Sequence, residues 1–291
     1  MEIIQLLIGG IANGCVYGLI ALGFVLIYKS SEGVNFAQGD MMMFGAFVAL
    51  GFVNEGYMGL AFLPGVILAC AVMGGVGYGI DRFVVRKIFG QPQFALVILT
   101  IAIGFVLRFV AGAIWGYTPL VLETPYAGVA FNVGGLVIAA EDLVAILATL
   151  VLTAVLWYFF ARTRIGVATQ AASQNQLSAY YMGIPVKFLN SLIWGLSGIV
   201  ATVAGVLAAS KGTIDPNLGL IGIKAFAAAV IGGFGSLPGA LMGGVIIGMI
   251  EPIAARYGPV GVSQTAPYVF MLLVLLLRPA GLFSQIQAKK V

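Results

Sequence analysis

Asn35, Gln38 and Asp40 are the polar side chains of this sequence best placed to form a binding site, because they lie within six residues at the edge of a long apolar run. The segment from Ser30 to Asp40 contains two glycines, which favour a break in a helix. A carboxylate beside such a break can accept hydrogen bonds from free backbone amides, and the amide side chains add neutral donors and acceptors. We expect these three residues to line a polar pathway. An ordinary interfacial carboxylate at Asp40 is the alternative.

The residue types exclude most catalytic chemistry. The chain has no histidine, which rules out Ser-His-Asp triads, Cys-His pairs and His-ligated metal sites. Its two cysteines, Cys15 and Cys70, lie in separate apolar runs, and we interpret each as a small buried residue. The sequence contains no GxxxxGK(S/T) phosphate loop, so ATP hydrolysis would need a separate chain. We expect no catalytic residue, no metal site and no cofactor.

The composition indicates a membrane protein. Hydrophobic residues make up 61% of the chain and charged residues only 8%, whereas a soluble domain carries roughly 25% charged residues. The 14 basic and 10 acidic residues are too few to cover the surface of a soluble protein of this size. The basic residues are scattered and form no patch with interleaved aromatics, so we expect no nucleic acid as a partner. We expect the protein to be surrounded by a lipid bilayer.

The chain contains seven uncharged runs of at least 19 residues, and each is long enough to cross ~30 Å of hydrocarbon as a helix. They lack the alternating pattern of membrane strands, which favours helices over a barrel. An eighth run, 33–54, is interrupted only by Asp40. The prediction is an all-α polytopic membrane bundle of about eight segments, forming one transmembrane domain over residues 1–291. The seven uncharged runs are 3–28, 56–80, 88–107, 143–161, 188–210, 225–250 and 257–277.

Glycine is unusually frequent, with 41 residues, and often recurs at four-residue spacing, as in Gly14/Gly18, Gly75/Gly79 and Gly244/Gly248. Small residues at this spacing let membrane helices approach closely. A denser glycine run at 232–239, with a proline, predicts that residues 223–256 form two half-helices entering and leaving on the same side. We therefore add to the expected pathway the residues Gly232, Gly233, Gly235 and Ser236.

Charge distribution predicts the orientation. Basic residues cluster in alternate connections, which the positive-inside rule assigns to the cytoplasm, while acidic residues fall in the opposite loops. The N-terminus is then external and the C-terminus cytoplasmic. Arg108 lies inside an apolar run, where snorkelling to the headgroups and a role in the pathway or in pairing both remain open. The basic residues used for this assignment are Lys29, Arg82, Arg86, Lys87, Arg162, Arg164, Lys187, Arg278, Lys289 and Lys290.

Residues 162–190 form the longest polar stretch on the predicted cytoplasmic side. Its composition predicts a helix over 168–184, ended by Gly183 and Pro185. Gln170, Gln174 and Gln176 would face outward, whereas Leu177, Tyr181 and Met182 would face other protein. The segment is interpreted as a docking site for a cytoplasmic partner, with a merely interfacial helix as the alternative.

Three sequence stretches together resemble a known family. The first runs from Val34 to Asp40, the second from Lys224 to Ala240, and the third from Arg278 to Phe283. The segment Ala-Ala-Ser-Gln-Asn before Ala179, followed by Met-Gly-Ile, is similar to the cytoplasmic coupling loop of ABC-importer permeases. As a whole, the chain resembles one permease subunit of the branched-chain amino acid ABC importers. The residues to which this resemblance assigns coupling to an ATPase are Gln170, Gln174, Asn175, Ala179, Gly183 and Ile184.

The resemblance implies a heteromeric importer in the cell inner membrane, with two permease chains, two cytoplasmic ATPase chains and an extracytoplasmic binding protein. Members of this family usually have histidine and glutamate where Gln38 and Asp40 stand, and often a charged residue where Gln176 stands. The carried solute is then a branched-chain or other small amino acid, with urea or short amides as the alternative. A stand-alone secondary transporter is the alternative from another class.

Overall fold

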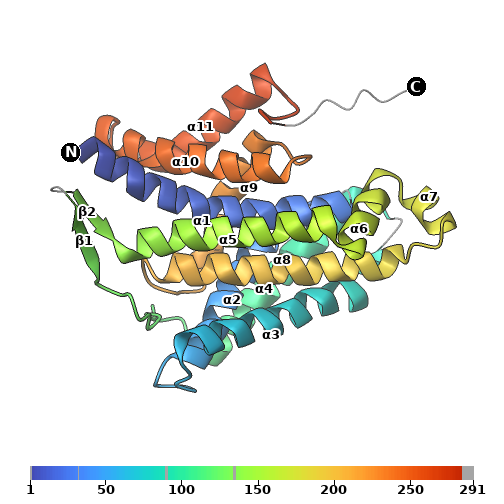
Figure 1. Cartoon of the computed structure of the whole chain (residues 1–291), viewed down its shortest axis with the longest axis horizontal. Helices are drawn as coiled ribbons and strands as arrows, with labels where there is room; N and C mark the ends of the chain where they lie inside the picture. Colours follow the sequence, from blue (N-terminus) through green and yellow to red (C-terminus); the bar gives the residue numbers. More distant parts are fainter. Residues whose placement is uncertain (1, 32, 89–90, 134–135, 284–291) are drawn as a thin grey trace.

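The computed structural model describes residues 2–31, 33–88, 91–133 and 136–283 of the chain. A bundle of helices carries a small β-hairpin at one end (Figure 1). Strands β1 (Ala130–Val133) and β2 (Leu136–Ala139) pair antiparallel, with Ala130 opposite Ala139. Lys289 and Lys290 lie outside the described residues. The α-helices are α1 (Glu2–Ser31), α2 (Gln38–Val53), α3 (Phe62–Phe83), α4 (Gln93–Trp115), α5 (Ala140–Arg162), α6 (Arg164–Gln174), α7 (Gln176–Tyr181), α8 (Val186–Ala209), α9 (Ile221–Gly232), α10 (Leu237–Tyr257) and α11 (Val262–Leu277).

Six helical stretches in the described part of the chain are long and apolar enough to cross a membrane, which confirms the predicted helical membrane bundle. They are α1, α3 with the short 3-10 helix η1 (Val85–Ile88), α4, α5, α8 and α10. Three shorter apolar stretches are α2, α9 with the preceding η2 (Leu218–Leu220), and α11. The predicted count of eight segments is not confirmed. The run 33–54 becomes helical only at Gln38, and the run 225–250 is divided where α9 ends at Gly232.

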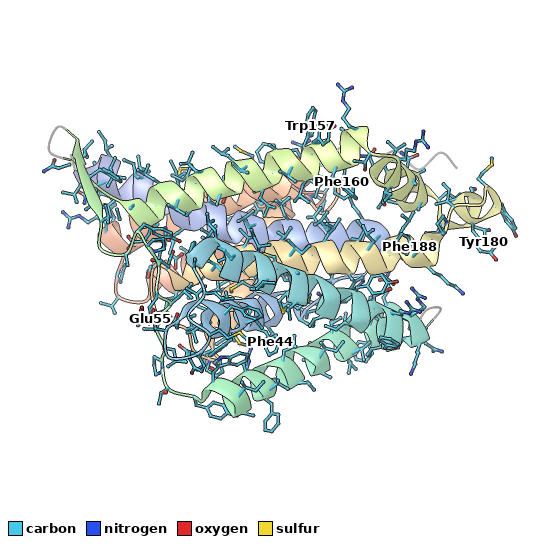
Figure 2. All side chains as sticks on the ribbon, turned by 60° about the horizontal axis from the view of Figure 1, so that its bottom comes forward. Phe44, Glu55, Trp157, Phe160, Tyr180 and Phe188 are labelled. Atoms are coloured by element: carbon cyan, nitrogen blue, oxygen red, sulfur yellow. The ribbon has the colours of Figure 1, made fainter. Side chains whose placement is uncertain are left out.

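Helices α1 and α8 form the centre of the bundle. In their apolar stretches 83% and 72% of the residues are buried, against 22% in α3, α4 and α5. Helix α1 packs against α5, α8, α9 and α10, while α8 also packs against α2 and α3. On the outer helix α5, Trp157 is 63% exposed and Phe160 is buried, so that the two residues mark its outer and inner faces (Figure 2). Such an apolar outer surface is suited to lipid contact.

Many charged residues lie at the two ends of the bundle. We call these ends the hairpin end, where β1 and β2 lie, and the α6–α7 end (Figure 1). Glu55 lies at the hairpin end beside Glu123, whose carboxylate accepts a hydrogen bond from the Glu55 backbone amide at 3.3 Å. At the α6–α7 end, Arg86 follows α3 and donates to the carbonyl of Lys187 at the start of α8, at 2.8 Å.

Glycines bring α1 and α10 into backbone contact. A Cβ placed on Gly14 would lie 2.7 Å from the Cα of Val245, and one placed on Gly248 would lie 2.3 Å from the carbonyl oxygen of Gly10. Separations below 3.0 Å leave no room for a side chain. The four-residue glycine spacing therefore packs these two helices as predicted, whereas a Cβ placed on Gly75 of α3 would have nothing within 4 Å.

We predict that Gly248→Leu destabilises the protein in detergent by about 1–3 kcal/mol or more, because the new side chain must push α1 away from α10. Thermal unfolding of the purified protein measures this effect. Gly75→Ala is the matched control, and it should not lower the midpoint, since alanine favours a helix over glycine by about 1 kcal/mol. A wild-type midpoint for Gly248→Leu would contradict the packing of α1 on α10.

Candidate functional site

The chain between α1 and α2 turns back into the bundle at Asn35. The Asn35 side-chain oxygen accepts a hydrogen bond from the Ala37 amide at 3.0 Å, and its backbone carbonyl accepts from the Gln38 amide at 3.2 Å. Asparagine favours such turns because its side chain replaces a backbone partner. The Phe36 amide donates to the Thr100 hydroxyl of α4 at 3.1 Å. These bonds satisfy backbone groups that lie away from either end of the bundle.

Gln38 holds the first turn of α2 between the middles of α1 and α8. Its side-chain oxygen accepts a hydrogen bond from the Ser197 hydroxyl of α8 at 2.8 Å. On α1, a Cβ at Gly23 would lie 1.9 Å from the Gln38 amide nitrogen, so only glycine leaves room for this side chain. Asn35 and Gln38 are both fully buried. The structure therefore brings these two predicted residues together as a support for α2.

Asp40, two residues further along α2, pairs with Arg108 of α4. The Arg108 Nη2 and Nε atoms donate to Asp40 Oδ1 at 2.7 and 3.2 Å. Hypothetical Cβ atoms on Gly104 and Gly219 would lie 2.3 and 2.4 Å from the Asp40 carboxylate oxygens, so both glycines are needed for its position. Arg108 is thus paired within the protein, as one of the roles left open for it predicts. Arg108 is missing from the predicted pathway set, although a cation inside an apolar run signals such a partner.

Asp40 and Arg108 lie on the wall of a groove of about 220 Å³. Most of the wall is apolar, and Phe226 packs against both Phe24 and Phe36, with ring centroids 5.7 and 5.4 Å apart. The groove is thus an apolar hollow with one ion pair on its wall. The residues that line the groove are Phe24, Phe36, Asp40, Ile101, Phe105, Arg108, Gly219, Leu220, Gly222, Ile223 and Phe226.

The predicted break at 232–239 is the turn between α9 and α10, at the α6–α7 end. Gly233 ends α9 with φ of 92°, a conformation that favours glycine, and the Ser236 hydroxyl caps α10 by accepting from the Gly239 amide at 3.1 Å. The backbone amides of Leu282 and Phe283 close the turn by donating to the carbonyls of Ile231 and Gly232. None of Gly232, Gly233, Gly235 and Ser236 is among the residues that line the groove.

The predicted helix over 168–184 is wrong as a single element, because Asn175 divides it into α6 and α7. Asn175 is extended, with φ of −157° and ψ of 100°, and its side chain accepts from the Ser178 amide at 2.9 Å. Asparagine is a poor residue inside a helix and a strong cap at its start, which explains the division. Gly183 ends the segment with φ of 80°, as its position predicts.

The predicted coupling residues face in different directions. Ala179 is buried and packs with Ala172, Val186 and Leu189, and Ile184 packs against the same cluster. Gln176 is partly buried and donates to the carbonyl of Ser30 at 2.9 Å, which ties α7 to the end of α1. The exposed members of the predicted set are Gln170, Gln174, Asn175 and Gly183.

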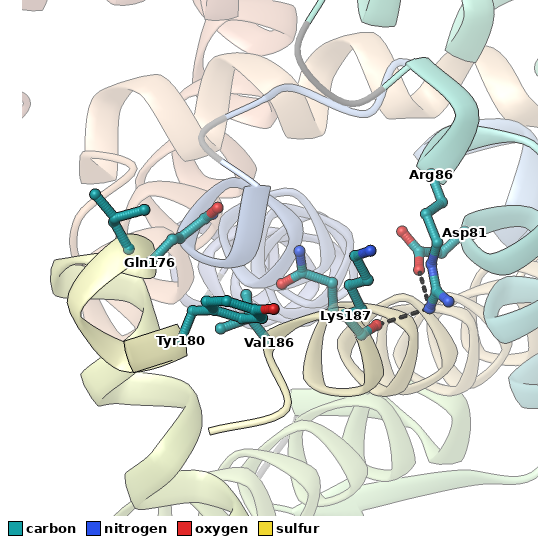
Figure 3. Close-up of a pocket in the computed structure, with 8 residues that line it drawn as sticks. Asp81, Arg86, Gln176, Tyr180, Val186 and Lys187 are labelled. Carbon is teal, nitrogen blue, oxygen red and sulfur yellow. Dashed lines mark hydrogen bonds and ion pairs between the residues drawn. The ribbon is translucent and has the colours of Figure 1, made fainter. Parts of the chain in front are cut away.

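Four apolar side chains on and after α7 are exposed, and two of them, Leu177 and Tyr180, line a cavity. They are 64–85% exposed, with Met182 the most exposed of them. Figure 3 shows Tyr180 and Gln176 across a cavity of about 560 Å³ from Arg86 and Asp81. The cavity lies between α7 and the ends of α3 and α8, so α7 is held by Gln176 and by the packing of Ala179 against Val186 and Leu189. The four exposed residues are Leu177, Tyr180, Tyr181 and Met182.

We predict that Asn175→Ala frays α7, because it removes the side-chain cap of a helix of only six residues and costs about 1 kcal/mol. Hydrogen exchange of amides 176–182 should become faster. Gln174→Ala is the matched control, since Gln174 is exposed and precedes the cap. In this variant, hydrogen exchange of amides 176–182 should match that of the wild type. Unchanged exchange in Asn175→Ala would show that the cap does not hold α7.

Comparisons with known proteins agree with this architecture. A family model described as "Branched-chain amino acid transport system / permease component" matches residues 6–278. The high-affinity branched-chain amino acid transport system permease protein BraD of Pseudomonas aeruginosa is 30% identical, over 99% of this chain and 98% of that protein. LivH of Escherichia coli K12, a permease protein of the same description, is 27% identical over 99% and 97% of the two chains.

A further relative is the probable branched-chain amino acid transport permease protein LivH of Methanocaldococcus jannaschii, 30% identical over 96% of this chain and 91% of that protein. Among solved structures, PsaBC from Streptococcus pneumoniae in complex with Fab gives a TM-score of 0.49 at 16% identity, over 94% of this chain and 91% of that chain, a likeness too weak to support an argument. The match to the family model and the full-length relatives are decisive. The chain belongs to the permease components of branched-chain amino acid transport systems, the membrane-spanning subunits of ABC importers.

Proposed function

We propose that this permease takes branched-chain amino acids across the inner membrane, together with a second permease subunit, two cytoplasmic ATPases and an extracytoplasmic binding protein. The names of the full-length relatives support the amino acid as substrate over urea or short amides. Membership of an ABC-importer permease family supports the second permease subunit. In this proposal the groove, with Asp40 on its wall, is half of the pathway.

The main support for an ATPase partner is the exposed apolar surface of α7. Tyr181 and Met182 are 77% and 85% exposed at the same end of the bundle as Arg86 and Lys187, beyond the ends of α3 and α8. Exposed aromatic and methionine side chains are typical of protein interfaces. Movement of a docked ATPase would reach α1 through the bond from Gln176 to Ser30 and reach α8 through the Ala179 cluster.

We predict that the complex, reconstituted with its binding protein in proteoliposomes, imports leucine when ATP is supplied, and that Gly183→Val abolishes coupling. At φ of 80° a β-branched residue is strained by about 1 kcal/mol or more, so the exit from α7 must change. The expected phenotype is ATP hydrolysis without import, or loss of the ATPase on purification.

Gly212→Val is the matched control for this experiment. Both glycines have nothing within 4 Å of a Cβ position, but Gly212 lacks the left-handed φ and follows α8 at the opposite end of the bundle. The control should import leucine normally. Coupled import by Gly183→Val at the wild-type rate would argue against coupling through α7, and failure of the unaltered complex to import leucine would remove the proposed function itself.

The proposal also places the α6–α7 end in the cytoplasm, because basic residues gather there. We predict that an impermeant thiol reagent labels Tyr117→Cys in intact spheroplasts, and labels Val167→Cys only after permeabilisation. Both side chains are more than half exposed, at opposite ends of the bundle, and the native cysteines Cys15 and Cys70 are first replaced by serine. Labelling of Val167→Cys in intact spheroplasts would reverse the orientation.

A further inference from the structure

The ion pair between Asp40 and Arg108 is open to the groove. The Asp40 and Arg108 side chains keep 13% and 24% of their surface exposed, and both belong to the groove wall. A charge away from the ends of membrane helices is costly, and such residues typically face a pathway and pair with each other. For merely joining α2 to α4, apolar packing would serve as well as an ion pair or better.

The pair also leaves part of its binding capacity unused. Both donating nitrogens of Arg108, Nε and Nη2, bind the same oxygen of Asp40, Oδ1. The pair itself therefore does not use Asp40 Oδ2 or Arg108 Nη1, and it differs from the fork-to-fork arrangement in which two parallel bonds saturate both groups. The Phe105 ring lies 5.8 Å from the Arg108 guanidinium carbon, which helps to orient the cation.

We propose that Asp40 and Arg108 recognise the two charges of a zwitterionic amino acid in transit, Asp40 binding the α-ammonium group and Arg108 the α-carboxylate. This inference rests on the proposed function and identifies the chemistry of its pathway. The aromatic wall formed by Phe24, Phe36 and Phe226 then takes the alkyl side chain. A neutral amide or urea offers no such pair of opposite charges.

An exchange of ion-pair partners, in which Asp40 and Arg108 release each other and bind the solute, suits transport better than tight binding of the solute. Without a solute, Asp40 and Arg108 neutralise each other; with the zwitterion present, each binds one of its charges, so no charge is left unpaired in either state. The gain in free energy on binding is then small, because one ion pair is lost as two form and the solute also loses its water. Transport requires a site that a solute can both enter and leave.

The decisive variant is Asp40→Asn/Arg108→Gln, which removes both charges and keeps hydrogen-bonding groups of similar size. Asp40→Asn alone is ambiguous, because an unpaired guanidinium destabilises the protein under any interpretation. In the proteoliposome assay the double variant should lose at least about tenfold in leucine uptake, as expected when hydrogen bonds to charged groups are lost. Co-purification of the ATPase shows that the complex has assembled.

Asp142→Asn/Lys211→Gln is the matched control. This pair, with Nζ and Oδ1 2.6 Å apart, is 20% and 17% exposed and lies outside the groove, so that its neutralisation should leave uptake unchanged. Wild-type uptake by the assembled Asp40→Asn/Arg108→Gln complex would overturn the inference, whereas import of leucine by the unaltered complex would leave the proposed function intact.

A labelling experiment keeps the inference testable if the double variant does not assemble. In a complex lacking Cys15 and Cys70, a cysteine at Ile223 on the groove wall should be protected from a thiol reagent by leucine, and not by isovalerate or isoamylamine, which each carry one of its charges. A cysteine at Leu276, 82% exposed on α11 and not part of the groove wall, is the control. Protection by either singly charged compound as strong as that by leucine, or no protection by leucine, would refute the inference.

Discussion

The start of α2 inside the bundle is the constraint on which the rest of the structure depends. A helix that begins away from the water leaves backbone amides without partners, and each unsatisfied group costs several kcal/mol in hydrocarbon. Asn35 and Thr100 supply acceptors for two of these amides, and Gln38 fixes the first turn through Ser197. This turn carries Asp40 to Arg108, and both side chains belong to the groove wall.

Much of the architecture could be predicted from the sequence, because membrane helices leave a strong local signal. Continuous apolar runs, the glycine-rich turn after Gly232 and the stop at Gly183 each depend on a few neighbouring residues. The division at Asn175 was also predictable, because asparagine caps helices more readily than it continues them. The prediction of a single helix through Asn175 gives too much weight to the helix propensity of the alanines on either side.

The candidate site was less predictable because it depends on contacts between distant residues. Asn35, Gln38 and Asp40 were found from their spacing, yet two of them are buried supports and only Asp40 reaches the groove. Arg108 stands 68 residues from Asp40, and no local pattern joins them. The same holds for Ala179, whose burial follows from Val186 and Leu189 across the turn at Gly183.

The glycines around Asp40 have a genetic consequence. A Cβ on Gly39 would lie 2.2 Å from the carbonyl oxygen of Gly219, and one on Gly222 would lie 2.6 Å from the Cα of Gly39. Cβ atoms on Gly104 and Gly219 would instead meet the Asp40 carboxylate, so at these four positions even a methyl group needs either the backbone or Asp40 to move. Every missense change in a glycine codon adds at least that methyl group. Random mutagenesis should therefore yield loss-of-transport alleles at these four codons regardless of which residue is substituted.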